Sequence, residues 1–258
     1  MQISDLENKT ADELKKYFNN QDTAIVFVHP LYTDVISILS MHEGLNNAEY
    51  RAVYEKLRKM SSDIKKSGLA KIYLLSADVY DFVVTDRQDA EYSGFLGAML
   101  LKKYQIYPKK EALLVKVSSQ NKSVKIMKQV KADVRASGLP QLLKKAGVEN
   151  IILLGEAAGS CVRSAAKVLV QGGLTCYRID ELLYWENTML DYFKKIKKTH
   201  ENLPEKIVQM LKSEGLWDFA NKKIEETEAE YAEIEKDEAK FKSITEKMPL
   251  KDFVKSLR

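Results

Sequence analysis

Cys161 is the residue whose surroundings most favour chemistry. It follows a short apolar run, Ile151–Leu154, and a tight loop, Glu156–Ser160, and it opens an Ala-rich segment of helical spacing that stops at Gly172–Gly173. The N–H groups at a helix start have no intrahelical acceptor and stabilise negative charge. A thiol placed there is biased toward the thiolate, the reactive form of cysteine. Cys161 is therefore a candidate nucleophile, and the alternative is a small buried apolar side chain, as most free cysteines are.

Two further polar residues follow predicted strands and could join Cys161. His29 directly follows the apolar run Thr23–Val28, and Lys128 closes the predicted strand Ser123–Lys128, where apolar and polar residues alternate. The carboxyl ends of parallel strands meet at one edge of a sheet, and sites lie at that edge. We therefore expect a nucleophile, a cation and a base in one pocket, with the lysine ammonium favouring the thiolate. The alternatives are a core histidine and a surface lysine.

The elements that would position these residues alternate along the chain between apolar strands and amphipathic helices. The predicted strands are Thr23–Val28, Ala70–Leu75, Glu111–Val117, Ser123–Lys128, Ile151–Leu154 and Leu174–Ile179. The predicted helices cover residues 5–19, 46–68, 90–104, 138–146 and 161–170. Continuous apolar strands that alternate with helices are typical of a parallel sheet covered on both faces. We therefore predict a doubly wound, mainly parallel α/β fold.

The small and polar residues around the cysteine form a pattern that can be compared with known families. They are Gly155, Cys161–Val162, the Ala165–Ala166 pair, Gly172–Gly173 and Asp180. With these residues, the segment 20–184 resembles the isochorismatase-like cysteine hydrolases. The resemblance implies the α/β fold of that family and hydrolysis of a small amide or related C–N bond through a thioester intermediate, without a cofactor. The Asp-x-His metal pattern of the family's nicotinamidases is not visible, so no metal is expected.

The resemblance also assigns roles to residues, with one departure from the family pattern. Lys128 best matches the catalytic lysine, because its spacing to Gly147 follows the family without a gap. Lys116 is the second candidate and would need an insertion before Gly147. Where the family carries its catalytic aspartate, this chain has His29. Since a neutral imidazole can take a thiol proton and return it to a leaving amine, two hypotheses stay open. One is an active hydrolase with His29 as the base, and the other is a catalytically silent relative with a binding or scaffolding role.

The resemblance further implies an oxyanion hole in the loop before the cysteine. In the family, the peptide bond between the fifth and fourth residues before the cysteine is cis, and here that bond joins Glu156 and Ala157. The cis bond would turn the Ala157 N–H toward the site. Together with the Cys161 N–H it would stabilise the negative oxygen that forms during attack on a carbonyl.

Composition and charge limit the partners and the cellular compartment that we expect for the protein. The 41 basic and 37 acidic residues are interspersed and leave a net charge of +4, which is typical of a solvated surface rather than of a nucleic-acid-binding face. The N-terminus is polar, no apolar run is long enough to span a bilayer, and the two cysteines do not suggest a disulfide framework. We therefore expect a cytoplasmic protein with no nucleic-acid or membrane partner, and the resemblance implies a small-molecule substrate.

The chain changes character after Tyr184. Residues 185–258 are highly charged, with apolar residues at helical spacing, and the predicted division is an α/β domain at 1–184 followed by a helical extension at 185–258. The spacing of the apolar residues in 221–242 is compatible with a short coiled-coil seam or with a solvated amphipathic helix. The extension could serve oligomerisation, cover the site or recruit a partner, and we expect a homo-oligomer.

Overall fold

The computed structural model of the chain describes residues 1–30, 48–85, 102, 112–117, 123–185 and 188–258. Within these residues the strands form one six-stranded sheet in the order β3-β2-β1-β4-β5-β6, and all neighbouring strands are parallel. The strands are β1 (Thr23–Val28), β2 (Ala70–Ser76), β3 (Leu113–Val117), β4 (Asn150–Gly155), β5 (Thr175–Leu183) and β6 (Glu246–Lys247). The predicted parallel α/β fold is confirmed.

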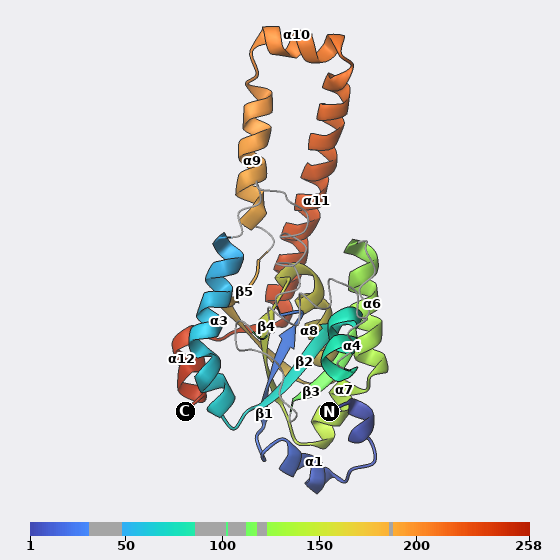
Figure 1. Ribbon diagram of the computed structural model, residues 1–258, viewed down its shortest axis with the longest axis vertical. Helices are drawn as coiled ribbons and strands as arrows, with labels where there is room; N and C mark the ends of the chain where they lie inside the picture. Colours follow the sequence, from blue (N-terminus) through green and yellow to red (C-terminus); the bar gives the residue numbers. More distant parts are fainter. Residues whose placement is uncertain (31–47, 86–101, 103–111, 118–122, 186–187) are drawn as a thin grey trace.

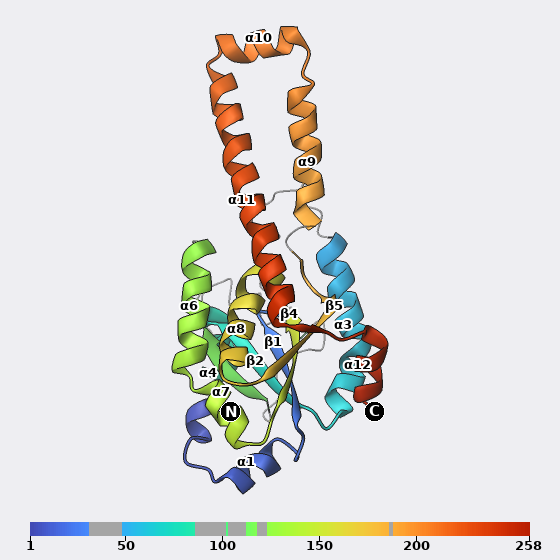
Figure 2. The ribbon, with the colours of Figure 1, turned by 180° about the vertical axis from the view of Figure 1, so that it is seen from behind.

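Helices cover both faces of the sheet (Figures 1 and 2). One face, here called the α8 face, packs against α1 (Ala11–Tyr17), α6 (Ser123–Ala136), α7 (Leu139–Lys145) and α8 (Arg163–Gln171). The opposite face, here called the α3 face, packs against α3 (Ala48–Lys66), α4 (Ala77–Thr85) and α12 (Leu250–Ser256). A sheet covered in this way buries both sides of its central strands, which explains their continuous apolar sequences.

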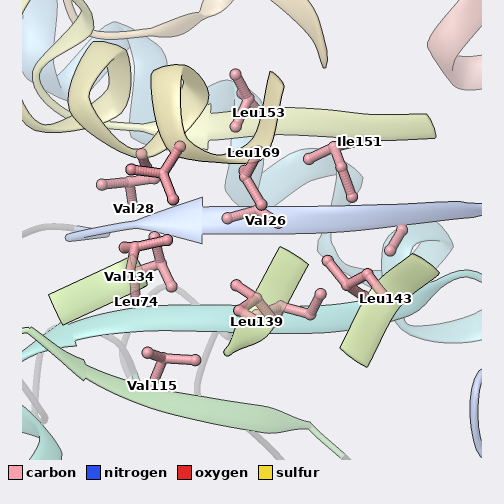
Figure 3. Close-up of a cluster of buried hydrophobic side chains, with 14 of the residues drawn as sticks. Val26, Val28, Leu74, Val115, Val134, Leu139, Leu143, Ile151, Leu153 and Leu169 are labelled. Atoms are coloured by element: carbon pink, nitrogen blue, oxygen red, sulfur yellow. The ribbon is translucent and has the colours of Figure 1, made fainter. Parts of the chain in front are cut away.

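Strand β1 shows this burial most clearly. Val26 and Val28 point to the α8 face, Ile25 and Phe27 point to the α3 face, and all four are fully buried. Figure 3 shows the α8 face, where Val134, Leu139, Leu143 and Leu169 from the helices lie over Val26, Val28, Leu74, Val115, Ile151 and Leu153 from the strands. The two clusters fix the register of β1 against β2 and β4, because a shift by one residue would exchange the two faces.

One predicted strand is wrong. The segment Ser123–Lys128 forms the first half of helix α6 rather than a strand. The alternation of apolar residues over six positions matched a strand, but the longer pattern Val124, Met127, Val130 and Val134 has the three- and four-residue spacing of a helix. Val130 and Val134 are fully buried on the α8 face, so this spacing decides the structure.

The other predicted helices agree with the structure to different degrees. The predicted helix at 46–68 is α3, and the one at 138–146 is α7. The leading segment 5–19 is divided into the 3-10 turn η1 (Ile3–Asp5) and helix α1, because Thr10 forms a capping box with Glu13 that starts a new helix. Apart from residue 102, the predicted helix at 90–104 lies outside the described residues.

The chain leaves the sheet after β5 and forms a helical arm. Helix α9 (Thr188–Glu201) runs outward, α10 (Glu205–Ser213) crosses the tip, and α11 (Leu216–Ile244) runs back to the domain (Figures 1 and 2). An ion pair of 2.6 Å between Lys197 and Glu228 joins the two long helices, and the His200 ring stacks on Trp217 with ring centroids 4.7 Å apart. No helix in the described residues is both long and apolar enough to cross a bilayer.

The end of the chain returns to the sheet. Strand β6 pairs with β5 at the sheet edge, and the Met248 N–H donates to the Arg178 carbonyl over 2.9 Å. Helix α12 then packs on the α3 face, where Phe253 is fully buried. In the sequence, the arm is therefore inserted between β5 and β6, which are neighbours in one sheet. The predicted division at residue 184 stays a prediction.

Candidate active site

The carboxyl edge of the sheet brings His29 next to the loop that leads to Cys161. Val28 and Gly155 are partners in the β1–β4 register, and the Glu156 N–H donates to the Val28 carbonyl over 2.9 Å. His29 follows Val28 directly, and its N–H donates to the Leu74 carbonyl of β2 over 3.0 Å. The backbone at His29 is thus held by the strands on both sides of β1. Its φ of 40° is unusual for a residue other than glycine.

Gly155 permits the close approach of the two strand ends. Its φ is 114°, and a Cβ atom at this position would lie 2.0 Å from the Val28 carbonyl oxygen. Any other residue would clash with β1 and would also adopt an unfavourable backbone conformation. This glycine therefore sets how closely the cysteine loop lies to the histidine that follows β1.

Cys161 lies in a π turn, η2 (Ala158–Val162), that continues into α8. The Ala157 carbonyl accepts hydrogen bonds from the Val162 N–H and the Ser160 N–H, each over 3.1 Å. The helical backbone thus begins before Cys161, not at it as the sequence suggested. The Cys161 side chain is buried on the α8 face beside Ala158 and Val162. Single π turns are rare and occur frequently at functional sites.

The peptide bond between Glu156 and Ala157 is cis, which confirms the expectation from the family pattern. Among the described residues no group accepts a hydrogen bond from the Ala157 N–H, whereas the next N–H, of Ala158, donates to the Tyr184 carbonyl over 2.8 Å. Ala157 is half-buried. A half-buried N–H without an acceptor among the described residues, four residues before a cysteine, can stabilise a negative oxygen.

Burial sets the electrostatics of the titratable groups here. It lowers the pKa of His29 to about 4, so the imidazole is neutral at neutral pH and can accept a proton. It raises the pKa of the second cysteine, Cys176 in β5, to about 12, which keeps that thiol protonated and unreactive. The two cysteines therefore have different surroundings, and only Cys161 lies at the carboxyl edge.

A contact that sequence reasoning missed joins the cysteine turn to the arm. Arg163 donates from Nε to the Gly159 carbonyl over 2.8 Å, and its terminal nitrogen lies 2.7 Å from the Asp237 carboxylate on α11. Both side chains are about nine-tenths buried. In the sequence, Asp237 belongs to a run of acids that resembles a solvated face. The available signal for its burial was that Asp237 lies four residues before Phe241, on the same helix face.

The two candidate lysines lie in different parts of the fold. Lys116 is on the edge strand β3, points to the α3 face and is bound by both carboxylate oxygens of Asp81 at 2.8 Å. Cys161 belongs to the cluster on the opposite face, which favours Lys128, and the choice between the two lysines stays a prediction. Lys128 is in α6, which contacts the η2 turn, and not at a strand end as predicted. Its side chain is outside the described part, and its role stays a prediction.

Two other expectations about the site concern residues that the structure describes only in part. From the sequence we expect loops at 30–45 and 78–95 that determine substrate specificity, and most of these residues lie outside the described part. Residues 78–85 belong to helix α4, so a loop is wrong there. Within the part of the chain that the structure describes, His, Cys, Asp and Glu side chains form no group of three that could hold a metal ion.

The chain can be compared with known proteins. No protein-family model matches it, and no curated protein matches it in sequence. An N-carbamoylsarcosine amidase from Thermoplasma acidophilum is similar in structure, with 17% identity over 68% of this chain and 92% of its own, at a TM-score of 0.42. An isochorismatase-like hydrolase from Alkaliphilus metalliredigens has 11% identity over 92% of this chain and 99% of its own, at 0.46. An octameric hydrolase of unknown specificity from Escherichia coli has 15% identity over 69% of this chain and 72% of its own, at 0.38. These similarities concern the fold.

Proposed function

We propose that the protein is a cysteine hydrolase that cleaves a small amide or related C–N bond through a thioester intermediate. The observation that carries this proposal is the Cys161 turn itself. It places a thiol at the carboxyl edge of a parallel sheet, beside the strand end that carries His29, and four residues after an Ala157 N–H that has no acceptor among the described residues. Nucleophile, base and oxyanion donor are the groups that acyl transfer requires.

The proposed reaction has two stages. In the first, His29 takes the Cys161 proton, and the sulfur attacks the carbonyl carbon of the substrate. The carbonyl oxygen becomes negative and accepts hydrogen bonds from the Ala157 and Cys161 N–H groups. The C–N bond then breaks, and His29 gives the proton to the leaving amine. In the second stage, water gives a proton to His29 and attacks the thioester carbon. The carboxylic acid leaves, and the sulfur regains its proton.

Proton transfer from Cys161 to His29 is unfavourable unless another group in the pocket stabilises the thiolate. A thiol with the ordinary pKa of about 8.5 lies about 4.5 units above the His29 pKa of about 4, which corresponds to about 6 kcal/mol against proton transfer. A cation beside the sulfur would reduce this difference by stabilising the thiolate. We propose that the Lys128 ammonium has this role, because α6 lies against the η2 turn.

Reactivity of the thiol tests the proposal. We expect iodoacetamide at neutral pH to label Cys161 well before Cys176, with labelling of both sites followed by peptide mass spectrometry. Equal and slow labelling of both cysteines would contradict the proposal. A set of small amides and ureido compounds, tested with the wild type and with Cys161→Ala, would then identify the substrate class.

A second candidate function is a binding or scaffolding role without catalysis. Two observations favour it: the low pKa of the buried His29, which makes it a weak base, and the exposed apolar residues of the arm. Labelling distinguishes the two functions, because a silent relative has no reason to keep Cys161 reactive. In either case we propose a cytoplasmic homo-oligomer.

A further inference from the structure

The part of the arm whose side chains are described contains no apolar core. Of the residues between 194 and 236 whose exposure is described, none is buried. Five large apolar side chains, here called the arm patch, are 37% to 61% exposed: Ile196, Ile207, Met210, Leu216 and Phe219. Helices gain most of their stability by packing an apolar face, and an exposed apolar patch of this kind marks an interaction site. The arm therefore presents a surface suited to a partner.

Charge identifies the partner. Lys194, Lys195, Lys197 and Lys198 form a basic band on α9, and α11 carries six glutamates between 225 and 235 as an acidic band. Within the chain, Glu226, Glu228 and Glu233 pair with Lys223, Lys197 and Lys236. The Lys197–Glu228 ion pair places the two bands at the same height of the arm. The other exposed charges of the two bands, Lys194, Lys195 and Lys198 on α9 and Glu225 and Glu235 on α11, are complementary to those of a second copy related by a two-fold rotation.

We propose that the arm patch and the two charged bands bind a second copy of this chain. In the dimer, the basic band of one α9 faces the acidic band of the partner's α11, and the reverse holds across the two-fold axis. The exposed apolar side chains of α10 and of the start of α11 are covered by the partner's arm.

The experiment uses the full chain and sedimentation velocity over a range of concentrations. We expect a reversible dimer that weakens at least tenfold in Met210→Ser/Phe219→Ser. We also expect Lys194→Glu/Lys198→Glu to weaken self-association and to regain a dimer when mixed with Glu225→Lys/Glu235→Lys. Lys251→Glu/Lys255→Glu on α12 makes the same charge change away from the arm and should leave the dimer unchanged. Circular dichroism confirms that each variant is folded.

Two results would overturn the dimer proposal. One is a wild-type chain that stays monomeric up to the highest concentration reached. The other is a dimer whose dissociation constant is unchanged by the serine substitutions, which would place the interface elsewhere.

A separate set of contacts carries a second inference, which rests on the proposed function. Asp237 uses both carboxylate oxygens: one lies 2.7 Å from Arg163 and the other 3.2 Å from Lys240. Arg163 in turn holds the Gly159 carbonyl, two residues before Cys161. The fixed guanidinium keeps this carbonyl turned toward α11 and so fixes the orientation of the turn that carries the thiol. We infer that Asp237 is a positioning residue for Cys161 and acts through Arg163.

The test compares alkylation rates of Cys161 as a function of pH. We expect Asp237→Asn to slow alkylation at least tenfold at neutral pH and to raise the pH midpoint of the reaction, while Asp237→Glu restores part of the rate. Lys247→Gln removes a different ion pair of the returning segment, the one with Asp180, and should change neither value. An unchanged rate and midpoint in folded Asp237→Asn would refute the positioning role.

Amide hydrogen exchange separates this inference from the proposed function. If wild-type Cys161 is no more reactive than Cys176, the hydrolase proposal fails. The contact can still be tested, because residues 158–162 should exchange faster in Asp237→Asn than in the wild type. Unchanged exchange in these residues would then overturn the positioning role by itself.

Discussion

At the scale of single residues, the site depends on backbone positions as much as on side chains. His29 has a positive φ, the Glu156–Ala157 bond is cis, and Gly155 lies against the Val28 carbonyl. These features meet where β1 and β4 end, at the edge where sites of parallel sheets lie. The chemistry proposed for Cys161 therefore depends on a short stretch of unusual backbone.

Gly155→Ala should be strongly destabilising. The new Cβ would lie 2.0 Å from the Val28 carbonyl oxygen, so β1 or β4 must move, and we expect a loss of more than about 3 kcal/mol in the free energy of unfolding. Urea denaturation measures this loss. Gly173→Ala is the matched control, because Gly173 also has a positive φ but no atom within 4 Å of a new Cβ, and it should cost only about 1 kcal/mol. Similar losses in both variants would contradict the argument from close approach.

His29 should make stability depend on pH. Its pKa in the folded protein, about 4, is below the unfolded value of about 6.5, so the unfolded chain binds the proton more readily. The stabilisation is present above pH 6.5 and is lost as the pH falls toward 4, by up to about 3 kcal/mol. The measurement is the difference between wild type and His29→Asn in urea unfolding at several pH values, which removes the common effect of the carboxylates. A difference that does not change between pH 7 and pH 4 would show that His29 does not titrate in this way.

At the scale of elements, the sequence predicts the strands that are buried on both faces of the sheet. It does not predict features that depend on contacts between residues far apart in the chain. Strands β1, β2 and β4 are apolar runs between turn residues, and they occur where predicted. The start of α6 was predicted as a strand because a six-residue alternation cannot distinguish the two structures. The contact of Asp237 with Arg163 could not be predicted, because the two residues lie 74 positions apart in the chain. Only the burial of Asp237 had a signal, namely its place four residues before Phe241. For the site, the cis bond and the position of the cysteine loop were predictable, whereas the π turn and the Arg163 contact were not.

The arm tip and the C-terminal helix should respond differently to the loss of a phenylalanine. Phe253 on α12 is fully buried in the α3 face, and Phe253→Ala should cost about 3–5 kcal/mol through the lost burial and the cavity left behind. Phe219 on α11 is 61% exposed, and Phe219→Ala should change the free energy of unfolding of the separated subunit by at most about 0.5 kcal/mol. Chemical denaturation at low protein concentration measures both. Equal costs would mean that the arm packs on its own domain.

At the scale of the whole molecule, the arm and the sheet share one continuous helix. Helix α11 starts at the arm tip with Leu216 and Phe219, carries the acidic band, and ends with Asp237 and Phe241 against the cysteine turn and α8 (Figure 2). The proposed dimer surface and the proposed active site are therefore connected by a single rigid element. If both proposals hold, alkylation of Cys161 should change with protein concentration over the range in which the dimer forms. A rate that is independent of concentration would mean that the two sites act separately.

The return of the chain to the sheet has a consequence for synthesis on the ribosome. Strand β6 and helix α12 follow the whole arm in the chain, yet they cover the edge of β5 and fill part of the α3 face. Until they emerge, the nascent domain exposes an open strand edge and an uncovered apolar surface, the two features that promote aggregation. A chain stopped after Ile244 should accordingly remain bound to chaperones or precipitate, whereas the full chain is released folded. The arm thus delays completion of the sheet during translation, because all of its residues are made before β6.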